Sequence, residues 1–520
     1  MPCCPWMTRL RWLLALVPVA AVLVVAGIAC SNALRPAPRP EAEETADKDA
    51  PAPKGGDRSC PMFGCTPARN MANPVEKNIP AEWSVKEGER KNVKWSAQLG
   101  TRGYFSPAVA SGKVFIPTNN GNPRDPKVQG PKAVLMCFRE SDGKFLWQLA
   151  HDMPPRDVAR EAGEDGLVSV PCVEGDRLWY VTPAAVVVCA TTDGKVVWQY
   201  DLMKELKVFP CYCAASSPLV AGDRVFLVTG NGRNGEAELP SPDAPSFVAL
   251  DKKTGKLLWK DSSPGKNIME GQWTSPAYGV IGGKPQVIFP GGDGWLYAFN
   301  PGDGKLLWKF DCNLKSAPPF KPGGRHPRNY ILAAPVIHDD KVYIGTGQLA
   351  DNGPGPAHFW CIDATKTGDL SPAGDNLDPK AEVNQKSGLV WHYGGAITPK
   401  PKKGRDVIFG RTYSTAAIHD GLVYIAELDG VLHCLDARTG QKYWSHDTKA
   451  AVWGSAYYVD GKVYLGTEDS EVNVFPAGKK PPPRDVPKNE CERTVKATPV
   501  AVNGVLYVVA EGTLYAIANK

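Results

Sequence analysis

Residues 249–259 read ALDKKTGKLLW, and closely related stretches recur along the chain. The other copies are AFNPGDGKLLW at 298–308, CLDARTGQKYW at 434–444, CFRESDGKFLW at 137–147 and CATTDGKVVW at 189–198. Each copy begins with a small residue that ends an apolar run, passes through a Thr-Gly or Asp-Gly pair and ends on a tryptophan. Because these pairs favour tight turns, each copy predicts a β-hairpin whose outer strand carries the tryptophan.

A second pattern precedes each copy and completes the repeat. It has Ser, Ala or Thr, often Pro, then two apolar residues, a turn and Val-Tyr or Val-Phe, as in SPLVAGDRVF at 217–226. Two hairpins make a four-stranded antiparallel unit, which at this period is typical of a propeller blade. The small residue recurs at eight positions: Cys137, Cys189, Ala249, Ala298, Cys361, Cys434, Val474 and Ala516. The sequence therefore predicts an all-β fold, an eight-bladed β-propeller of four-stranded antiparallel blades.

Tryptophans are expected to join neighbouring blades, since a lone hairpin cannot bury an indole that removes roughly 150–250 Å² from water. The expected docking residues of the blades are Trp147, Trp198, Trp259, Trp308, Trp391 and Trp444. Blade seven has no matching tryptophan. The chain ends soon after Ala516, so blade eight lacks an outer strand. The orphan strand NVKWSAQL, which contains Trp95, is predicted to complete blade eight and close the ring.

The A-x-D-x-x-T-G-x-x-x-W motif resembles the tryptophan-docking repeat of pyrroloquinoline-quinone-type (PQQ) propellers, over roughly residues 95–520. That superfamily includes the quinoprotein alcohol dehydrogenases and the propeller lipoprotein of the outer-membrane β-barrel assembly machinery. The motif is a packing device, so the resemblance indicates a fold and not an activity. The segment 59–94 contains CPMFGCTPARN, which is similar to the lead-in of many such propellers, and we expect it to dock on the side or base.

Residues 1–30 predict a targeting segment. Arginines precede an uncharged run from Trp12 to Ala29, which is near the lower length limit for a membrane-spanning helix. The run ends in G-I-A-C, so Cys30 is a candidate for lipidation, and an uncleaved anchor is the competing interpretation. Residues 31–58 are rich in Pro, Ala and charge and predict a disordered tether. Simple secretion is a third interpretation; all three place the propeller outside the cytoplasm, and the first two, which we favour, anchor it to a membrane.

The dehydrogenase branch of the resemblance implies a quinone held between a tryptophan and a disulfide of adjacent cysteines, with calcium bound by Glu and Asn. The repeats contain no adjacent cysteine pair, no C-x-x-C-H haem motif and no zinc-type spacing. We therefore assign no catalytic residue, no metal ligand and no cofactor; an enzyme of this kind would need PQQ with calcium. Trp273 and Arg411 precede inner strands and are the candidates for channel-lining, cofactor-binding groups.

Cysteines divide into core and loop positions among the 14 in the chain. Five fill apolar strand positions, the four named above and Cys172. The loop-like cysteines are Cys60, Cys65, Cys211, Cys213, Cys312 and Cys491. They can form disulfides in an oxidising compartment, and the sequence leaves their pairing open. Among other polar residues, Glu427, Glu468 and Asp469 are expected at charged strand-end tips.

The net charge is only +5, and no basic stripe with interleaved aromatic residues appears, which excludes a nucleic-acid interface. Insertions between strands are expected to form surface loops at 119–132, 231–246, 312–330, 366–388, 397–406 and 476–496, the last linking blades seven and eight. The sequence favours a membrane-tethered, monomeric, non-catalytic propeller that binds envelope or periplasmic proteins through these loops. The alternative is a PQQ-dependent alcohol or sugar dehydrogenase.

Overall fold

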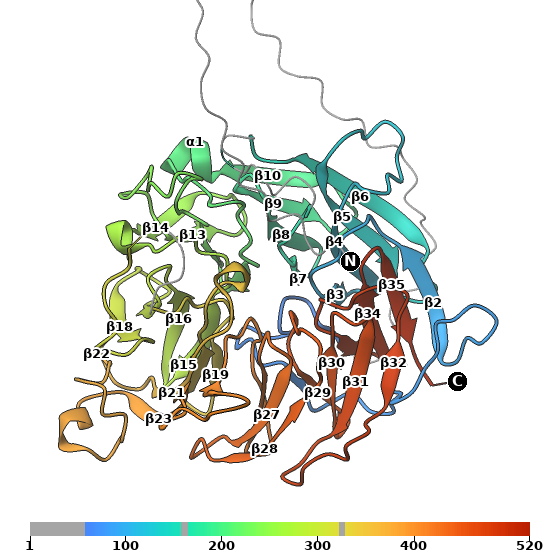
Figure 1. The fold of residues 1–520 in the computed structure, drawn as a ribbon. Coiled ribbons are helices and arrows are strands. Elements are labelled where there is room, and N and C mark those ends of the chain that lie inside the picture. The colour runs from blue at the N-terminus through green and yellow to red at the C-terminus, as the bar shows by residue number, and fades with distance from the viewer. Residues whose placement is uncertain (1–57, 156–157, 159–164, 322–327, 520) are drawn as a thin grey trace, which may run out of the picture. The chain divides into compact units, whose positions relative to one another are not determined.

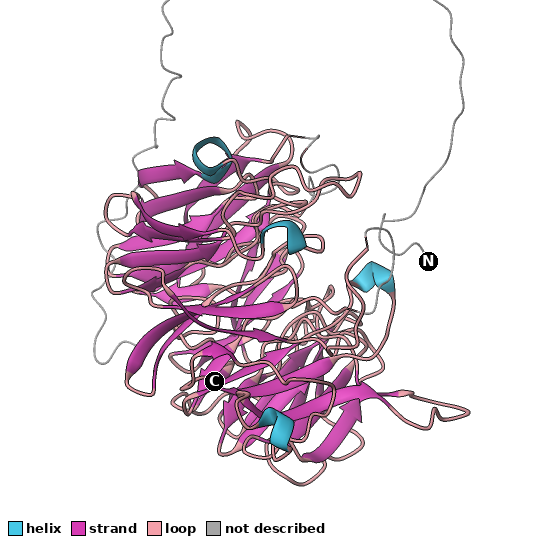
Figure 2. Cartoon of the chain, turned by 90° about the vertical axis from the view of Figure 1, so that its left-hand side faces the viewer, coloured by secondary structure: helices cyan, strands magenta, loops and turns pink. Residues whose placement is uncertain are grey.

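The computed structural model describes residues 58–155, 158, 165–321 and 328–519. Cys30, the apolar run and the tether up to residue 57 lie outside the described residues. Within those ranges, no helix has the length and apolar character needed to cross a bilayer. Strands and loops dominate, with only short helical turns between them (Figure 2).

Eight blades confirm the predicted propeller (Figure 1). Blade one holds β3 (Ala108–Ala110), β4 (Lys113–Asn119), β5 (Lys132–Arg139) and β6 (Phe145–Asp152). Blade two holds β7 (Cys172–Glu174), β8 (Arg177–Val181), β9 (Val186–Thr191) and β10 (Val196–Asp201). Blade three holds β11 (Leu219–Ala221), β12 (Arg224–Val228), β13 (Phe247–Asp251) and β14 (Leu257–Asp261). Blade four holds β15 (Ala277–Ile281), β16 (Lys284–Pro290), β17 (Trp295–Phe299) and β18 (Leu306–Asp311).

The second half of the ring follows the same order. Blade five holds β19 (Val336–His338), β20 (Lys341–Gly345), β21 (His358–Asp363) and β23 (Leu389–Ala396). Blade six holds β25 (Ala417–His419), β26 (Leu422–Ala426), β27 (Val431–Asp436) and β28 (Lys442–Asp447). Blade seven holds β29 (Tyr457–Val459), β30 (Lys462–Gly466), β31 (Glu471–Pro476) and β32 (Lys488–Glu490). Blade eight holds β33 (Val500–Val502), β34 (Val505–Ala510), β35 (Thr513–Ile517) and β2 (Val93–Gln98).

A few short elements supplement the blades. The additional strands are β1 (Ala72–Asn73), β22 (Gly368–Asp369) and β24 (Val407–Phe409), and the helical elements are α1 (Leu202–Leu206) and 3-10 turns at Gly265–Asn267, Ala350–Asn352 and Glu382–Asn384. The middle strands are apolar runs, such as β5, because both of their faces are buried between neighbouring blades. The outer strand β14 alternates between less and more exposed residues because one of its faces meets solvent.

Each docking tryptophan except Trp308 fastens one blade to the next. Its indole N–H donates to a backbone carbonyl in the following blade: Trp95 to Glu140, Trp147 to Thr192, Trp198 to Lys252, Trp259 to Pro301, Trp391 to Ala437 and Trp444 to Gly478. Trp308 donates instead to Gln286 Oε1 in its own blade, at 2.7 Å, because an insertion replaces the short turn of blade five. It still packs, fully buried, among apolar residues of blades four and five.

Two constraints require glycine in the Thr-Gly and Asp-Gly turns: the backbone there has a positive φ, and an indole ring packs directly against the residue. Gly440 has φ +72°, and a Cβ atom there would lie 2.6 Å from the ring of Trp391. We expect Gly440→Ala to lower the free energy of unfolding by about 3 kcal/mol, from left-handed strain of about 1–2 kcal/mol plus overpacking. Gly421, in the same blade, also has φ +72° but has no atom within 4 Å of such a Cβ. Gly421→Ala should therefore show only the strain cost in urea denaturation, and equal losses for the two variants would contradict this account.

The N-terminal strand closes the ring as predicted. β2 pairs with β35 and sets Trp95 opposite Ala516. Blade seven, whose outer strand has no tryptophan, receives one from the lead-in. Trp83 stacks on Tyr464 of β30 with ring centroids 6.5 Å apart, which is the kind of contact that Trp444 makes with Tyr424 in blade six.

The Ser or Thr that opens a repeat links its blade to the preceding one through its hydroxyl group. The backbone N–H of Ser217 donates to Ser275 Oγ at 2.9 Å, and that of Ser455 donates to Thr498 Oγ1 at 2.8 Å. Hydroxyls of one blade thus accept hydrogen bonds from the preceding blade near the axis. These bonds satisfy buried backbone donors that the inner strands cannot pair within their own blade.

One expected insertion is corrected. The stretch 476–496 was predicted to link blades seven and eight, but its residues 488–490 form β32, the outer strand of blade seven. This strand has no apolar alternation, since two of its three residues are glutamate and lysine at exposed positions. It is a strand because its backbone pairs with β31, and its side-chain pattern alone does not predict one.

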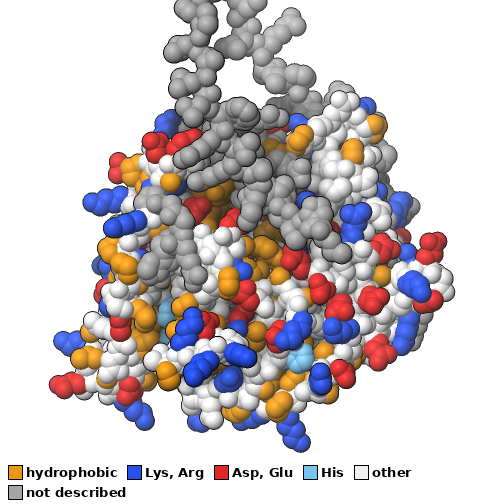
Figure 3. Space-filling model, viewed as in Figure 1, with side chains coloured by type: hydrophobic (Ala, Val, Ile, Leu, Met, Phe, Trp, Pro, Cys, Tyr) orange, Lys and Arg blue, Asp and Glu red, His pale blue; other side chains and the backbone are white. Residues whose placement is uncertain are grey.

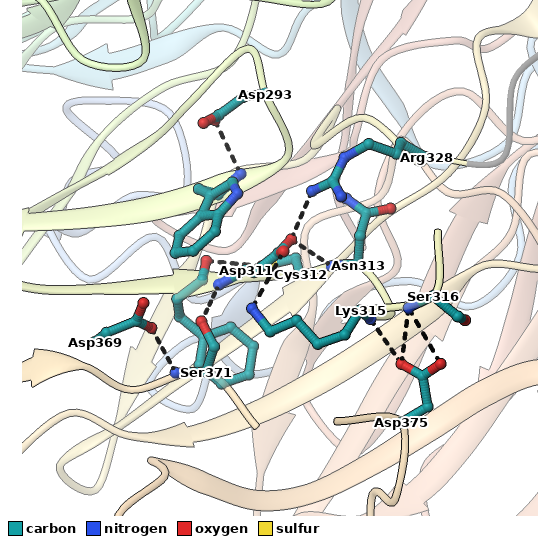
Figure 4. A network of polar contacts seen from close by, with 12 residues as sticks. Asp293, Asp311, Cys312, Asn313, Lys315, Ser316, Arg328, Asp369, Ser371 and Asp375 are labelled. Carbon is teal, nitrogen blue, oxygen red and sulfur yellow. Dashed lines mark hydrogen bonds and ion pairs between the residues drawn. The ribbon is translucent and has the colours of Figure 1, made fainter. Parts of the chain in front are cut away.

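The insertion 366–388 reaches back to blade four, where β22 pairs in parallel with β18. Figure 4 shows the polar network that fastens it there. The buried carboxylate of Asp311 accepts from Arg328 at 2.8 Å, and Asp375 accepts from the backbone N–H of Lys315 at 2.6 Å. Cys312, expected in a loop, is fully buried within this region.

Candidate functional site

All inner strands occupy the same place in their blades, so the connections that enter them gather on one face of the ring. The connections between the second and third strands of each blade lie on the same side. We call this side the loop face, and the side of the Thr-Gly and Asp-Gly turns the hairpin face. The insertions 119–132 and 231–246 belong to the loop face, because they join β4 to β5 and β12 to β13.

The lead-in lines the axis of the ring. Residues 60–73 together hydrogen-bond to all eight blades, each at the inner strand or up to two residues before it. Their partners are Val109, Val173, Ser217, Tyr278, Ile337, Ile418, Tyr458 and Ala501. The free edges of inner strands need such partners, since unpaired backbone groups in a closed interior are costly. Only the continuation, around Trp83, lies on the side of the ring, so the segment is more central than the expected docking on side or base.

Cys60 and Cys65 form a disulfide within this segment. Cys211, Cys213, Cys312 and Cys491, the other loop-like cysteines, are free. The bridge closes the short loop that carries Phe63. That loop places the Phe63 carbonyl where Arg69 donates to it, at 2.7 Å.

Arg69 is the central side chain of the lead-in and is fully buried. Its guanidinium donates to the carbonyls of Phe63, Ser217, Pro218 and Pro276, at 2.7–3.3 Å. Burial lowers the pKa of Arg69 to about 10, so it remains charged at neutral pH. One residue thus joins the lead-in to blades three and four.

Trp273 and Arg411, the sequence candidates, both lie on the loop face. Trp273 packs at a tilt against Tyr212 with centroids 6.2 Å apart and donates its indole N–H to Cys211 O at 2.9 Å. Arg411 pairs with Asp429 at 2.9 Å and donates to Ala350 O at 2.6 Å. Trp273 lies in the connection that enters blade four and Arg411 in the connection that enters blade six, and the two residues contact different neighbours.

Further aromatic and charged residues on this face were missed from the sequence. Glu270 accepts hydrogen bonds from the hydroxyls of Tyr212 and Tyr330, each at 3.2 Å, and burial raises the pKa of Glu270. The Lys496 ammonium lies over the rings of Tyr104, at 5.3 Å, and Trp453, at 5.4 Å. The only feature of the sequence that could have identified these residues is their position, because all of them precede inner strands, as Trp273 does.

The charges of the loop face are largely paired with one another. Lys496 lies 3.4 Å from Glu468 and 3.8 Å from Glu511, and Arg102 lies 3.4 Å from Glu511. Figure 3 likewise shows cationic and anionic side chains interspersed over the face in view. Such a surface can bind a partner by matched contacts.

Two depressions open on the loop face. One of about 510 Å³ is lined by residues including Arg411, Asp429, Trp453 and Glu468. The other, of about 450 Å³, lies where blades eight and one meet and includes Arg102 and Arg493.

Glu427 corrects a sequence expectation. It was expected at a charged tip, but it is fully buried. It accepts from Arg405 at 2.8 Å and from His433 Nε2 at 2.7 Å, and His433 Nδ1 contacts the hydroxyl of Tyr393 at 3.1 Å. Burial would raise the pKa of Glu427, but His433 and Arg405 together lower it. The group fastens the 397–406 insertion to blade six and lies below the surface.

The residues of the loop face do not match the quinone site that the dehydrogenase resemblance implies. Tyr212 separates Cys211 from Cys213, and both thiols are free. The carboxylates of Glu270, Asp429 and Glu511 are each engaged by the protein's own groups. In the described part of the chain, no three His, Cys, Asp or Glu side chains lie together as a metal site requires. No chemical step through a quinone is therefore derived.

Comparison with known proteins gives two kinds of relative. A family model described as outer membrane protein assembly factor BamB matches residues 131–395 and 380–478. A polyvinylalcohol dehydrogenase of Sphingopyxis sp. (strain 113P3) is 22% identical over 367 residues, 61% of this chain and 51% of that protein. Outer membrane protein assembly factor BamB of Yersinia pestis is 24% identical over 249 residues, 43% of this chain and 57% of that protein. The chain thus spans about half the length of these curated relatives.

Solved structures show the same fold. BamB from Moraxella catarrhalis superposes with a TM-score of 0.50 at 13% identity, covering 82% of this chain and 96% of that chain. A quinohemoprotein alcohol dehydrogenase from Comamonas testosteroni gives 0.60 at 15% identity, covering 89% and 81%. At these identities the likeness concerns the fold alone.

Proposed function

The chain belongs to the PQQ-like propeller family described as outer membrane protein assembly factor BamB, and from this premise we propose that it is a non-catalytic binding propeller of the cell envelope. Its N-terminal segment tethers it to a membrane on the extracytoplasmic side. Its loop face binds envelope or periplasmic proteins.

The aromatic side chains of the loop face carry this proposal. Tyr104, Trp273, Tyr413 and Trp453 are partly exposed and all come from connections that enter inner strands. Tyr413 and Trp453, from neighbouring blades, pack edge to face at 5.4 Å. Aromatic residues supported in this way are typical anchors of protein interfaces, because they add large contact area at small entropic cost.

A PQQ-dependent oxidoreductase is the second candidate. It is favoured by the polyvinylalcohol dehydrogenase of Sphingopyxis, whose similarity covers 61% of this chain. We rank it second because the cysteines and carboxylates of the loop face do not match the quinone site that the dehydrogenase resemblance implies.

Capture from envelope fractions tests the first candidate. The tagged full chain is crosslinked in cells, and its partners are identified for wild type and for Tyr413→Ala/Trp453→Ala. We expect a partner whose recovery falls roughly thirtyfold in the double variant, since paired hot spots contribute about 2 kcal/mol or more. The control is Val197→Ala/Leu258→Ala, which truncates exposed aliphatic residues on outer strands. Equal loss in both variants, or none in either, would argue against a loop-face interface.

Titration of the same full chain with PQQ, with and without calcium, tests the second candidate. Tryptophan fluorescence reports binding, because Trp273 lies on the loop face. Saturable one-to-one quenching that depends on calcium would replace the scaffold proposal with the dehydrogenase.

A further inference from the structure

The depression between blades eight and one is lined by groups from three connections of the loop face. These groups are Thr101, Arg102, Asn119, Asn120, Gly121, Gly130, Pro131 and Arg493. Its volume of about 450 Å³ falls in the range of small-ligand sites. The wall contains two guanidinium groups and no carboxylate.

Buried hydrogen bonds hold the floor of this pocket rigid. The Oδ1 atom of Asn119, a buried residue, accepts from the backbone N–H groups of Thr101 at 2.7 Å, Arg102 at 3.2 Å and Gly121 at 3.2 Å. The Thr118 hydroxyl donates to Arg102 O at 2.6 Å. The backbone that carries Arg102 is therefore fixed before any ligand arrives, which lowers the entropic cost of binding.

The 119–132 insertion forms one wall and is fastened at both ends. Asn120 Nδ2 donates to Val128 O at 2.8 Å and to Gly130 O at 3.1 Å. Arg124 stacks over the Phe145 ring at 4.6 Å and donates to Gln98 O at 2.6 Å. These contacts hold the loop in place as one wall of the pocket.

Among the described residues, the unpaired charge of the pocket belongs to Arg493. Arg102 pairs with Glu511. Lys496 lies 3.8 Å from Glu511 and 3.4 Å from Glu468, so these two cations face two carboxylates. Arg493 is exposed at the mouth and makes no ion pair or side-chain hydrogen bond within the residues that the structure describes. A guanidinium without a partner presents a fork of donors that matches a carboxylate or phosphate.

We propose that this pocket binds a small organic oxyanion, a phosphate or carboxylate carried on a body of sugar size. Arg493 holds the anionic group, with Arg102 beside it. The wall that faces the body is formed by Thr101, Asn119 and Asn120. The pocket shares no lining residue with the depression beside Trp453. Loss of oxyanion binding and loss of the proposed envelope partner are therefore separate results.

Calorimetric titration of the detergent-solubilised full chain tests the proposal, with glucose 6-phosphate, glucuronate and glucose as probes. We expect both acids to bind and glucose not to bind, with affinity for the acids falling at higher salt. Arg493→Ala should weaken binding of both acids roughly tenfold or more, and Arg493→Lys should weaken it less, because it keeps the charge and loses the fork.

Arg438→Ala is the matched control, since Arg438 is exposed in the hairpin-face turn of blade six. It should leave all three titrations unchanged. Arg493 is exposed, so its replacement should not disturb folding, which near-ultraviolet circular dichroism would verify. Absence of binding by either acid, equal binding of glucose, or unchanged affinity in Arg493→Ala would each overturn the proposal.

Discussion

Replacing Arg69 by methionine is expected to lower the free energy of unfolding by about 4 kcal/mol or more. The substitution keeps side-chain length but removes every donor. Four backbone carbonyls, in the lead-in and in blades three and four, then lose a charged partner. Hydrogen bonds to charged groups contribute about 1.5–3 kcal/mol each, and buried acceptors left unpaired cost a further 1–3 kcal/mol.

Urea denaturation followed by tryptophan fluorescence measures the loss for Arg69→Met. Arg69→Lys should recover only part of it, because a single ammonium cannot reach carbonyls of two blades and the lead-in together. Arg438→Ala, at an exposed turn, should stay within about 0.5 kcal/mol of wild type. A loss for Arg69→Met no larger than that of Arg438→Ala would show that the lead-in does not hold the ring.

The fold could be predicted because its decisive contacts repeat. Trp391 meets Gly440 as Trp259 meets Gly304, since a Cβ atom on either glycine would lie 2.6–2.7 Å from the ring, so one copy of the motif predicts the others. Ring closure by Trp95 followed from counting strands. β32 could not be found in this way, since it carries neither the tryptophan nor an apolar alternation and is a strand only because β31 lies beside it.

The candidate site was only partly predictable, because its contacts join residues that are far apart in sequence. Trp273 and Arg411 were chosen because they precede inner strands, and the structure places both on the loop face. Arg69 donates a hydrogen bond to Pro276, which is 207 residues away. Glu427 is paired with Arg405, which lies in an insertion that the other blades lack. Nothing in the local pattern around Glu427 distinguishes it from an exposed strand-end acid.

Acid should destabilise the propeller between pH 6.5 and 4, through a buried histidine pair in blade five. His358 Nδ1 and His392 Nε2 lie 2.8 Å apart, and the His392 ring packs at a tilt against Trp360 with centroids 4.5 Å apart. Burial lowers the pKa of His358 to about 4 and that of His392 to about 3, the latter also through His358. In the unfolded chain both would titrate near 6.5.

Because both pKa values are lower in the folded state, the unfolded chain takes up protons first as the pH falls. Stability is therefore full above pH 6.5 and declines toward pH 4, by on the order of 3 kcal/mol for each site. The variant His358→Phe/His392→Phe removes both partners together, so neither ring is left unpaired. The difference between its unfolding free energies at pH 7.5 and 4.5 should be smaller than that of wild type by about 3 kcal/mol or more.

Other buried groups titrate in the same range but cancel in this comparison. Burial raises the pKa of Asp293 to about 6, so that carboxyl favours the folded state as the pH falls, in wild type and variant alike. Val197→Ala, at an exposed position of an outer strand, removes no titrating group and should keep the wild-type slope. A double variant whose stability falls with acid as steeply as that of wild type would mean that the pair is protonated in the folded protein, and that the acid sensitivity of the propeller originates elsewhere.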